Sequence, residues 1–158
     1  MRLSGQRIRN RYCQFTPEDV EYVVRQYVGT VRWEDCGELQ GHLNDSNLSD
    51  GGKVSIGISP SQSPLEQRIT LFHEIFHLIF DWFYDFPVNV QPYRRKLRQL
   101  GRGFKQRDQE KEARYFTLFA RLEFIEEWFV EEEAWRFYFA HRAYADALFL
   151  ELLHNGGG

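Results

Sequence analysis

An apolar stretch from residue 69 to residue 80 carries the motif that most constrains this sequence. It reads Ile-Thr-Leu-Phe-His-Glu-Ile-Phe-His-Leu-Ile-Phe, so His73, Glu74 and His77 stand as His-Glu-x-x-His among uncharged neighbours. On a helix, residues four apart lie on one face, so His73 and His77 can each offer a ring nitrogen to one metal ion. The stretch therefore predicts a buried helix that bears a zinc site, with Glu74 as the general base.

The alternative is a helical protein without a metal, in which His73 and His77 are core residues satisfied by hydrogen bonds. A motif of three fixed positions also arises by chance. The flanking residues favour the metal, because titratable groups are costly to bury in so apolar a helix unless they have partners.

The composition predicts one globular domain over residues 1–158. Hydrophobic residues make up 42% of the chain and aromatic residues 16%, which is enough for a packed core. The net charge of −3 gives no nucleic-acid signal, and Cys13 and Cys36 are too few for a disulfide framework. We find no secretory signal and no apolar run long enough to span a membrane, so we expect a cytoplasmic protein without a membrane partner.

Local patterns predict an α+β fold that is mostly helical, with a small antiparallel or mixed sheet of three strands or fewer. Thr16 is a good N-cap for a first helix that ends near Gly29. Residues 31–33 and 53–59 have strand patterns, and the polar residues 34–52 indicate turns. We expect residues 54–58 to form a sheet edge that can pair with an extended peptide.

The second half of the sequence predicts a pair of C-terminal helices. We expect helix from residue 108 with a break near residues 131–134, then a C-terminal helix over about 134–154 and a disordered tail at 155–158. The domain core would span about 15–125. Aromatic residues at helical spacing predict buried faces. The following residues are assigned to them: Tyr115, Phe116, Phe119, Leu122, Phe124, Trp128, Phe129, Trp135, Phe137, Tyr138, Phe139, Tyr144, Leu148, Leu150 and Leu153. The acids Glu123, Glu126, Glu127 and Glu131 to Glu133 are expected to face water.

A basic stretch at residues 94–107 lies between the central helix and this pair. Such a stretch is usually a solvated surface, although it can contact an acidic partner; direct nucleic-acid binding is not expected. Gly101 and Gly103 favour a mobile connection near the site.

A catalytic zinc needs three protein ligands and one open position, so the motif requires a third group. Glu112 suits this role because it shares a helix face with apolar residues, although it can also be a first-turn acid favoured by the helix dipole. Asp81 lies one turn beyond His77 and is a better outer acceptor orienting that ring. Candidates for a second donor to the oxyanion are Tyr84, Tyr93, Tyr115 and His141.

Residues 70–79 and 110–116 together resemble the ImmA/IrrE family of bacterial and phage metallopeptidases. That family pairs a phrase like "Arg-x-Thr-Leu-Ala-His-Glu-x-x-His" with a later "Glu-x-Glu-Ala-x-x-Phe-Ala". Arg68, Thr70 and Leu71 match the first, and Glu110, Glu112, Ala113 and Phe116 match the second. Phe72, Arg114 and Thr117 depart from it. The resemblance implies a zincin-like fold, Zn²⁺ held by His73, His77 and Glu112, and a protein substrate such as a helix-turn-helix repressor.

We therefore expect a zinc-dependent endopeptidase that hydrolyses a peptide or protein, with Glu74 as its catalytic residue. The alternative is a non-catalytic zinc-binding regulator that uses the same fold to hold a partner. Glu74 discriminates between them, because a purely structural zinc site has no use for that carboxylate.

Overall fold

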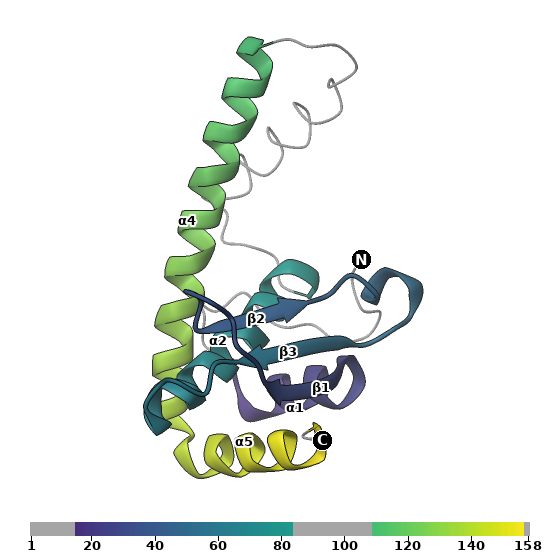
Figure 1. Cartoon of the computed structure of the whole chain (residues 1–158), viewed down its shortest axis with the longest axis vertical. Helices are drawn as coiled ribbons and strands as arrows, with labels where there is room; N and C mark the ends of the chain where they lie inside the picture. Colours follow the sequence, from purple (N-terminus) through teal and green to yellow (C-terminus); the bar gives the residue numbers. More distant parts are fainter. Residues whose placement is uncertain (1–14, 84–108, 157–158) are drawn as a thin grey trace.

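A computed structural model describes residues 15–83 and 109–156, and it has an α+β fold in which helices outweigh a small sheet (Figure 1). This confirms the predicted fold class. The basic stretch 94–107, Cys13, Tyr84 and Tyr93 lie outside the described residues. The elements in chain order are α1 (Pro17–Tyr27), β1 (Val28–Trp33), β2 (Gly41–Asn44), a 3-10 turn (Leu48–Asp50), β3 (Val54–Ile58), α2 (Pro64–Trp82), α4 (Gln109–Ala140) and α5 (Arg142–Gly156).

Both early helices begin at capping boxes that the sequence encodes. The Thr16 hydroxyl accepts the Asp19 amide and Ser63 accepts that of Glu66, while each acid returns a bond to the backbone of its cap. A proline follows each cap, where the missing N–H costs nothing. The predicted start of α1 is therefore confirmed.

The sheet is mixed, with the strand order β1-β3-β2. β3 pairs in parallel with β1 and antiparallel with β2, so β3 is the central strand and the prediction that it forms an edge is wrong. The edge on this side is β2, which arises within the stretch predicted as turns. Its sequence, Gly-His-Leu-Asn, gives little strand signal, and pairing with β3 decides its conformation.

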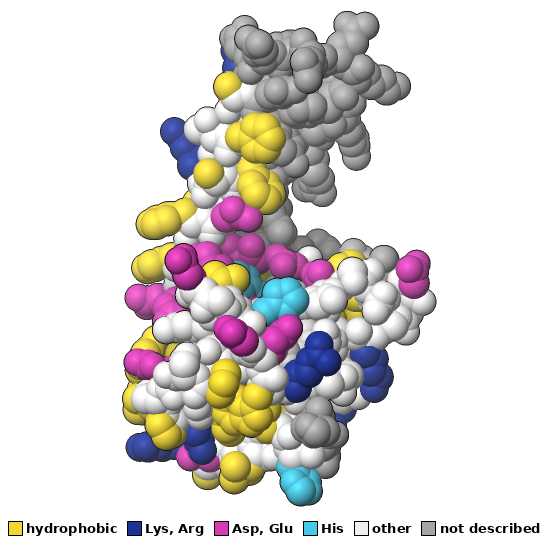
Figure 2. Space-filling view, viewed as in Figure 1, with side chains coloured by type: hydrophobic (Ala, Val, Ile, Leu, Met, Phe, Trp, Pro, Cys, Tyr) yellow, Lys and Arg dark blue, Asp and Glu magenta, His cyan; other side chains and the backbone are white. Residues whose placement is uncertain are grey.

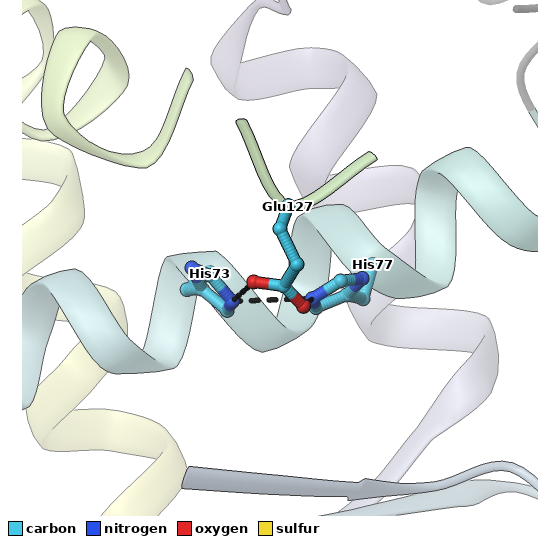
Figure 3. Close-up of side chains that lie close together, drawn as sticks. All are labelled: His73, His77 and Glu127. Carbon is cyan, nitrogen blue, oxygen red and sulfur yellow. Dashed lines mark hydrogen bonds and ion pairs between the residues drawn. The ribbon is translucent and has the colours of Figure 1, made fainter. Parts of the chain in front are cut away.

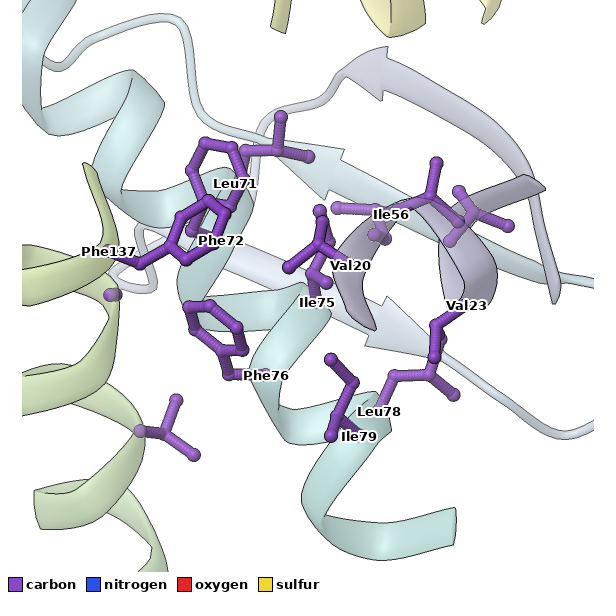
Figure 4. Close-up of a cluster of buried hydrophobic side chains, with 14 of the residues drawn as sticks. Val20, Val23, Ile56, Leu71, Phe72, Ile75, Phe76, Leu78, Ile79 and Phe137 are labelled. Carbon is purple, nitrogen blue, oxygen red and sulfur yellow. The ribbon is translucent and has the colours of Figure 1, made fainter. Parts of the chain in front are cut away.

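Helix α2 forms the centre of the core (Figure 4). Its apolar side chains meet Val20 and Val23 of α1, Ile56 of β3 and Phe137 of α4. Phe72 and Phe76 lie with their ring centroids 5.1 Å and 5.5 Å from that of Phe137. The fully buried side chains of α2 are Leu71, Phe72, Ile75, Phe76, Leu78, Ile79 and Phe80.

Helix α4 is continuous through residues 131–134, so the predicted break there is wrong. The chain turns instead at His141, between α4 and α5. The reason is the burial of Glu133, which is 1% exposed and bonded by the Phe15 amide and the Arg136 guanidinium. The bond from Phe15 ties the C-terminal part of α4 to the chain just before α1.

Helix α5 packs on β1 of the sheet, where Phe149 contacts Trp33. It also contacts α2, where Asp146 forms an ion pair with Arg68. Helix α5 extends to Gly156, so residues 155 and 156 are helical and the prediction that they belong to a disordered tail is wrong. Residues 157–158 lie outside the described part. Among the described residues, no helix is both long and apolar enough to cross a membrane.

The aromatic faces predicted for the long C-terminal helices are only partly buried. Phe124 is 75% exposed and Trp128 is 55% exposed. At 100° per residue they do not share a face with the buried Leu122, Val130 and Phe137. Phe116, Phe119, Trp135, Phe139 and Leu150 are also exposed.

Candidate metal centre

The two histidines of the motif point toward the same place between α2 and α4 (Figure 3). Their Nε2 atoms lie 3.1 Å apart, although each belongs to a different turn of α2. The Glu127 carboxylate of α4 closes the group: its oxygens lie 3.1 Å from His73 Nε2 and 2.7 Å from His77 Nε2. His73, His77 and Glu127 are thus close enough to hold a metal ion.

Two further glutamates of α4 contact the outer nitrogens of the same rings. Glu131 Oε2 lies 2.7 Å from His73 Nδ1, and Glu126 Oε1 lies 3.7 Å from His77 Nδ1. As the residue number rises along α2 it falls along α4, so the two helices run antiparallel here. His73 and His77 are one helical turn apart on α2, and Glu127 and Glu131 are one helical turn apart on α4. The two pairs therefore have the same spacing.

Among the side chains that the structure describes, Glu127 is the α4 carboxylate in contact with both rings, and the role of Glu112 as a ligand stays a prediction. Glu112 lies in the first turn of α4, about 22 Å along the helix axis from Glu127, and its side chain is outside the described residues. The expectation that the α4 acids face water is wrong for the buried Glu133 and the half-buried Glu126. Glu127 and Glu131 are exposed as expected, although their carboxylates contact the two histidines. A signal was present: Glu127 and Glu131 repeat the four-residue spacing of the two histidines within a helix rich in aromatic residues.

Glu74 lies beside this group and is 8% exposed. Within the described part of the chain its carboxylate makes no hydrogen bond or ion pair, so it is buried without a direct partner. Strand β2 passes close to it because Gly41 has no side chain: a Cβ there would lie 3.1 Å from Glu74 Oε1 and 2.5 Å from Thr70 Cγ2.

The pKa values in the group move as burial and close opposite charges dictate. Burial raises the pKa of Glu74, and the charges of His77 and His73 oppose that rise. Burial lowers the pKa of His77, but the Glu126 and Glu127 carboxylates outweigh it and raise that pKa to about 10. Hydrogen bonds from His73 and His77 hold the pKa of Glu127 well below its ordinary range.

A cleft of about 800 Å³ opens over the group, between α2, α4 and the β2 edge. His73, Glu74 and His77 line it on the α2 side, and Glu127 and Glu131 line it on the α4 side. The β2 wall consists of Glu38, Leu39, Gln40, Gly41, His42, Leu43 and Asp45, and Ile69, Thr70 and Asp81 complete the lining.

The remaining predicted residues divide between the cleft and the rest of the molecule. Asp81 lines the cleft and lies close to His77 and Glu126, at the position predicted for it one turn beyond His77. His141 does not line it and instead packs on Phe137, 4.8 Å between ring centroids. The side chain of Tyr115 is outside the described residues. His42 was not singled out from the sequence. It lines the cleft, and its charge opposes the rise in the pKa of Glu74.

Comparison of the chain with protein-family models, curated proteins and solved structures finds no match.

Proposed function

We propose that the protein is a zinc-dependent endopeptidase whose metal ligands are His73, His77 and Glu127 and whose general base is Glu74. The observation that carries this proposal is the convergence of two Nε2 atoms and one carboxylate beside a buried, unbonded glutamate. We assign the third-ligand role to Glu127 in place of Glu112, because Glu127 is the α4 carboxylate in contact with both rings.

The donor set fits zinc. Ligand atoms held tetrahedrally at zinc distances lie about 3.3 Å from one another. The two Nε2 atoms are 3.1 Å apart, and the Glu127 oxygens lie 3.1 Å and 2.7 Å from them. Glu131 on His73 Nδ1 is the outer carboxylate that metal-binding histidines usually have. Three ligands leave one open position, which favours a catalytic site over a structural one.

A zinc ion held there would supply Lewis acidity, which activates water and polarises a carbonyl group. Glu74 would accept a proton from the attacking water as its oxygen bonds to the carbonyl carbon. It would then deliver that proton to the nitrogen as the C–N bond breaks. Burial raises the pKa of Glu74, which favours its uptake of a proton. His42 on the facing wall could donate to the developing oxyanion.

The free edge of β2 is where we expect the substrate backbone to bind. β2 is the last strand of the sheet in the described part of the chain, and it lines the cleft. An extended peptide paired with that edge would pass over His73 and His77. The ImmA/IrrE resemblance would make the substrate a regulatory protein such as a helix-turn-helix repressor.

Elemental analysis of the purified chain, combined with three variants, tests the proposal. The wild type should bind one zinc, and Glu127→Ala should lose it, whereas Glu112→Ala should keep it. Glu74→Gln should retain zinc and lose about 10²-fold or more in peptide hydrolysis. A wild type with no affinity for zinc would overturn the proposal.

The same experiment decides against catalysis if Glu74→Gln keeps both its zinc and the full function of the protein. The site would then belong to a zinc-binding regulator, the alternative expected from the sequence.

A further inference from the structure

The cleft over the metal group has a strongly one-sided charge. Among the described residues that line it, no lysine or arginine occurs. The carboxylates that line it are Glu38, Asp45, Glu74, Asp81, Glu127 and Glu131. In the space-filling view, acidic side chains (magenta) gather around histidines (cyan) near the middle of the molecule (Figure 2).

Two of these acids, Glu38 and Asp45, lie on the β2 wall. Glu38 precedes the edge strand β2 and is exposed, and Asp45 directly follows the strand. Asp45 is fixed in place because its Oδ2 accepts the Trp82 indole N–H at 2.9 Å. The edge that would hold a substrate backbone is therefore flanked by a carboxylate at each end.

A bound divalent cation would offset only two of these negative charges. The field that remains is negative, and the walls of a cleft strengthen such a field by keeping high-dielectric water away. Glu74 adds a separate observation, because it is buried, faces this cleft and has no hydrogen-bond partner within the described part of the chain. The cleft thus presents negative charge both at its floor and along its rim.

We propose that this cleft selects cationic peptides, with lysine or arginine side chains near the bond to be cleaved, and that Glu38 and Asp45 bind those side chains. This inference rests on the proposed peptidase function and adds its substrate class. Leu39, which is 64% exposed beside Glu38, offers apolar contact to the stems of such long side chains.

Three fluorogenic peptides of equal length test the inference, identical except for arginine, glutamine or glutamate at the positions flanking the central bond. With the zinc-loaded full chain we expect kcat/KM to be about 10-fold higher for the arginine peptide than for the glutamine peptide. The glutamate peptide should be slower still. The preference should shrink between 20 and 300 mM NaCl, because salt screens exposed charges.

Binding is measured separately, by fluorescence anisotropy of the same peptides on the metal-free chain. The arginine peptide should bind most tightly there as well. Selective binding without cleavage by the zinc-loaded protein would support the cationic preference and contradict the peptidase function. Cleavage at equal rates for all three peptides would overturn the preference and leave the peptidase function standing.

Charge variants assign the preference to the β2 wall. Glu38→Gln should reduce the advantage of the arginine peptide, and Glu38→Lys should abolish or reverse it; Asp45→Asn should act in the same direction. Glu132→Gln is the matched control, since Glu132 is an exposed acid of α4 that does not line the cleft. A Glu38→Lys protein with an undiminished preference for arginine would contradict the assignment.

Discussion

The carboxylate of Glu131 joins the imidazole of His73 to the indole of Trp135. One oxygen lies 2.7 Å from His73 Nδ1, and the other accepts the Trp135 N–H at 2.8 Å. The second bond holds the carboxylate in position, and the first fixes the ring so that Nε2 is directed at His77 and Glu127.

Removal of Glu131 should therefore weaken metal binding even though Glu131 is not a proposed ligand. We expect Glu131→Ala to lower zinc affinity about 10- to 100-fold, measured by competition with a chromophoric chelator. Glu131→Gln keeps an oxygen acceptor and should recover much of the loss. Trp135→Phe keeps the stacking on Phe139 but loses the N–H, so its effect should be smaller.

Glu132→Ala serves as the control for these variants, because it removes the neighbouring acid without touching His73. The positioning role of Glu131 is wrong if the Glu131→Ala and Glu132→Ala proteins bind zinc equally well.

The part of the site formed by local sequence could be predicted, and the part formed by packing could not. His73, Glu74 and His77 are set by helical spacing on one element, and the Ser63 capping box fixes where that helix starts. The identity of the third ligand depends on the axial register in which α4 packs against α2. A shift of one helical turn exchanges one glutamate for another, and α4 has many.

The same limit applies to the sheet. The alternating pattern of residues 54–58 predicts a strand but not its place in the strand order. β2 has almost no strand pattern of its own and depends on its pairing with β3. The edge of the sheet, and with it the acidic wall proposed to bind the substrate, could be found only once the strands were placed.

Gly41 is required by the close approach of β2 to α2. In Gly41→Ala the new Cβ would lie 2.5 Å from Thr70 Cγ2 and 3.1 Å from Glu74 Oε1, so one of them must move. We expect a loss of about 1–3 kcal/mol in stability by denaturant unfolding and a fall in hydrolysis, with zinc content unchanged.

A second substitution checks this explanation. Thr70→Ser removes Cγ2 but keeps the hydroxyl that donates to Gln62 Oε1 at 2.7 Å. The Gly41→Ala/Thr70→Ser protein should regain much of the lost stability. If it is no more stable than Gly41→Ala alone, the clash with Thr70 is not the cause.

The buried pair of Glu133 and Arg136 should control stability in a pH-dependent way. Burial raises the pKa of Glu133, and Arg136 opposes that rise. Arg136→Ala leaves the buried carboxyl with the Phe15 amide but without its partly exposed cation, at a cost of about 1–3 kcal/mol. A protonated carboxyl is cheaper to bury than an ionised one, so the penalty should grow as pH rises through the raised pKa.

Chemical denaturation at pH 5 and pH 8 measures this difference. Glu133→Gln in the Arg136→Ala background should remove most of the pH dependence. An equal penalty at both pH values would show that Glu133 does not change its charge between them.

Zinc should stabilise the folded chain, because the group that binds it forms only when α2 and α4 pack together. At a zinc concentration about 100 times Kd the gain is about 2.7 kcal/mol, which corresponds to a rise of roughly 5–10 °C in Tm for a chain of this size. Magnesium and calcium should give little or no rise, since these cations prefer sites made of oxygen ligands. His77→Ala should abolish the zinc effect, whereas His154→Ala, which removes an exposed histidine at the end of α5, should leave it intact. A zinc-dependent rise that survives His77→Ala would mean that the ion binds elsewhere, and the centre between α2 and α4 would lose its role.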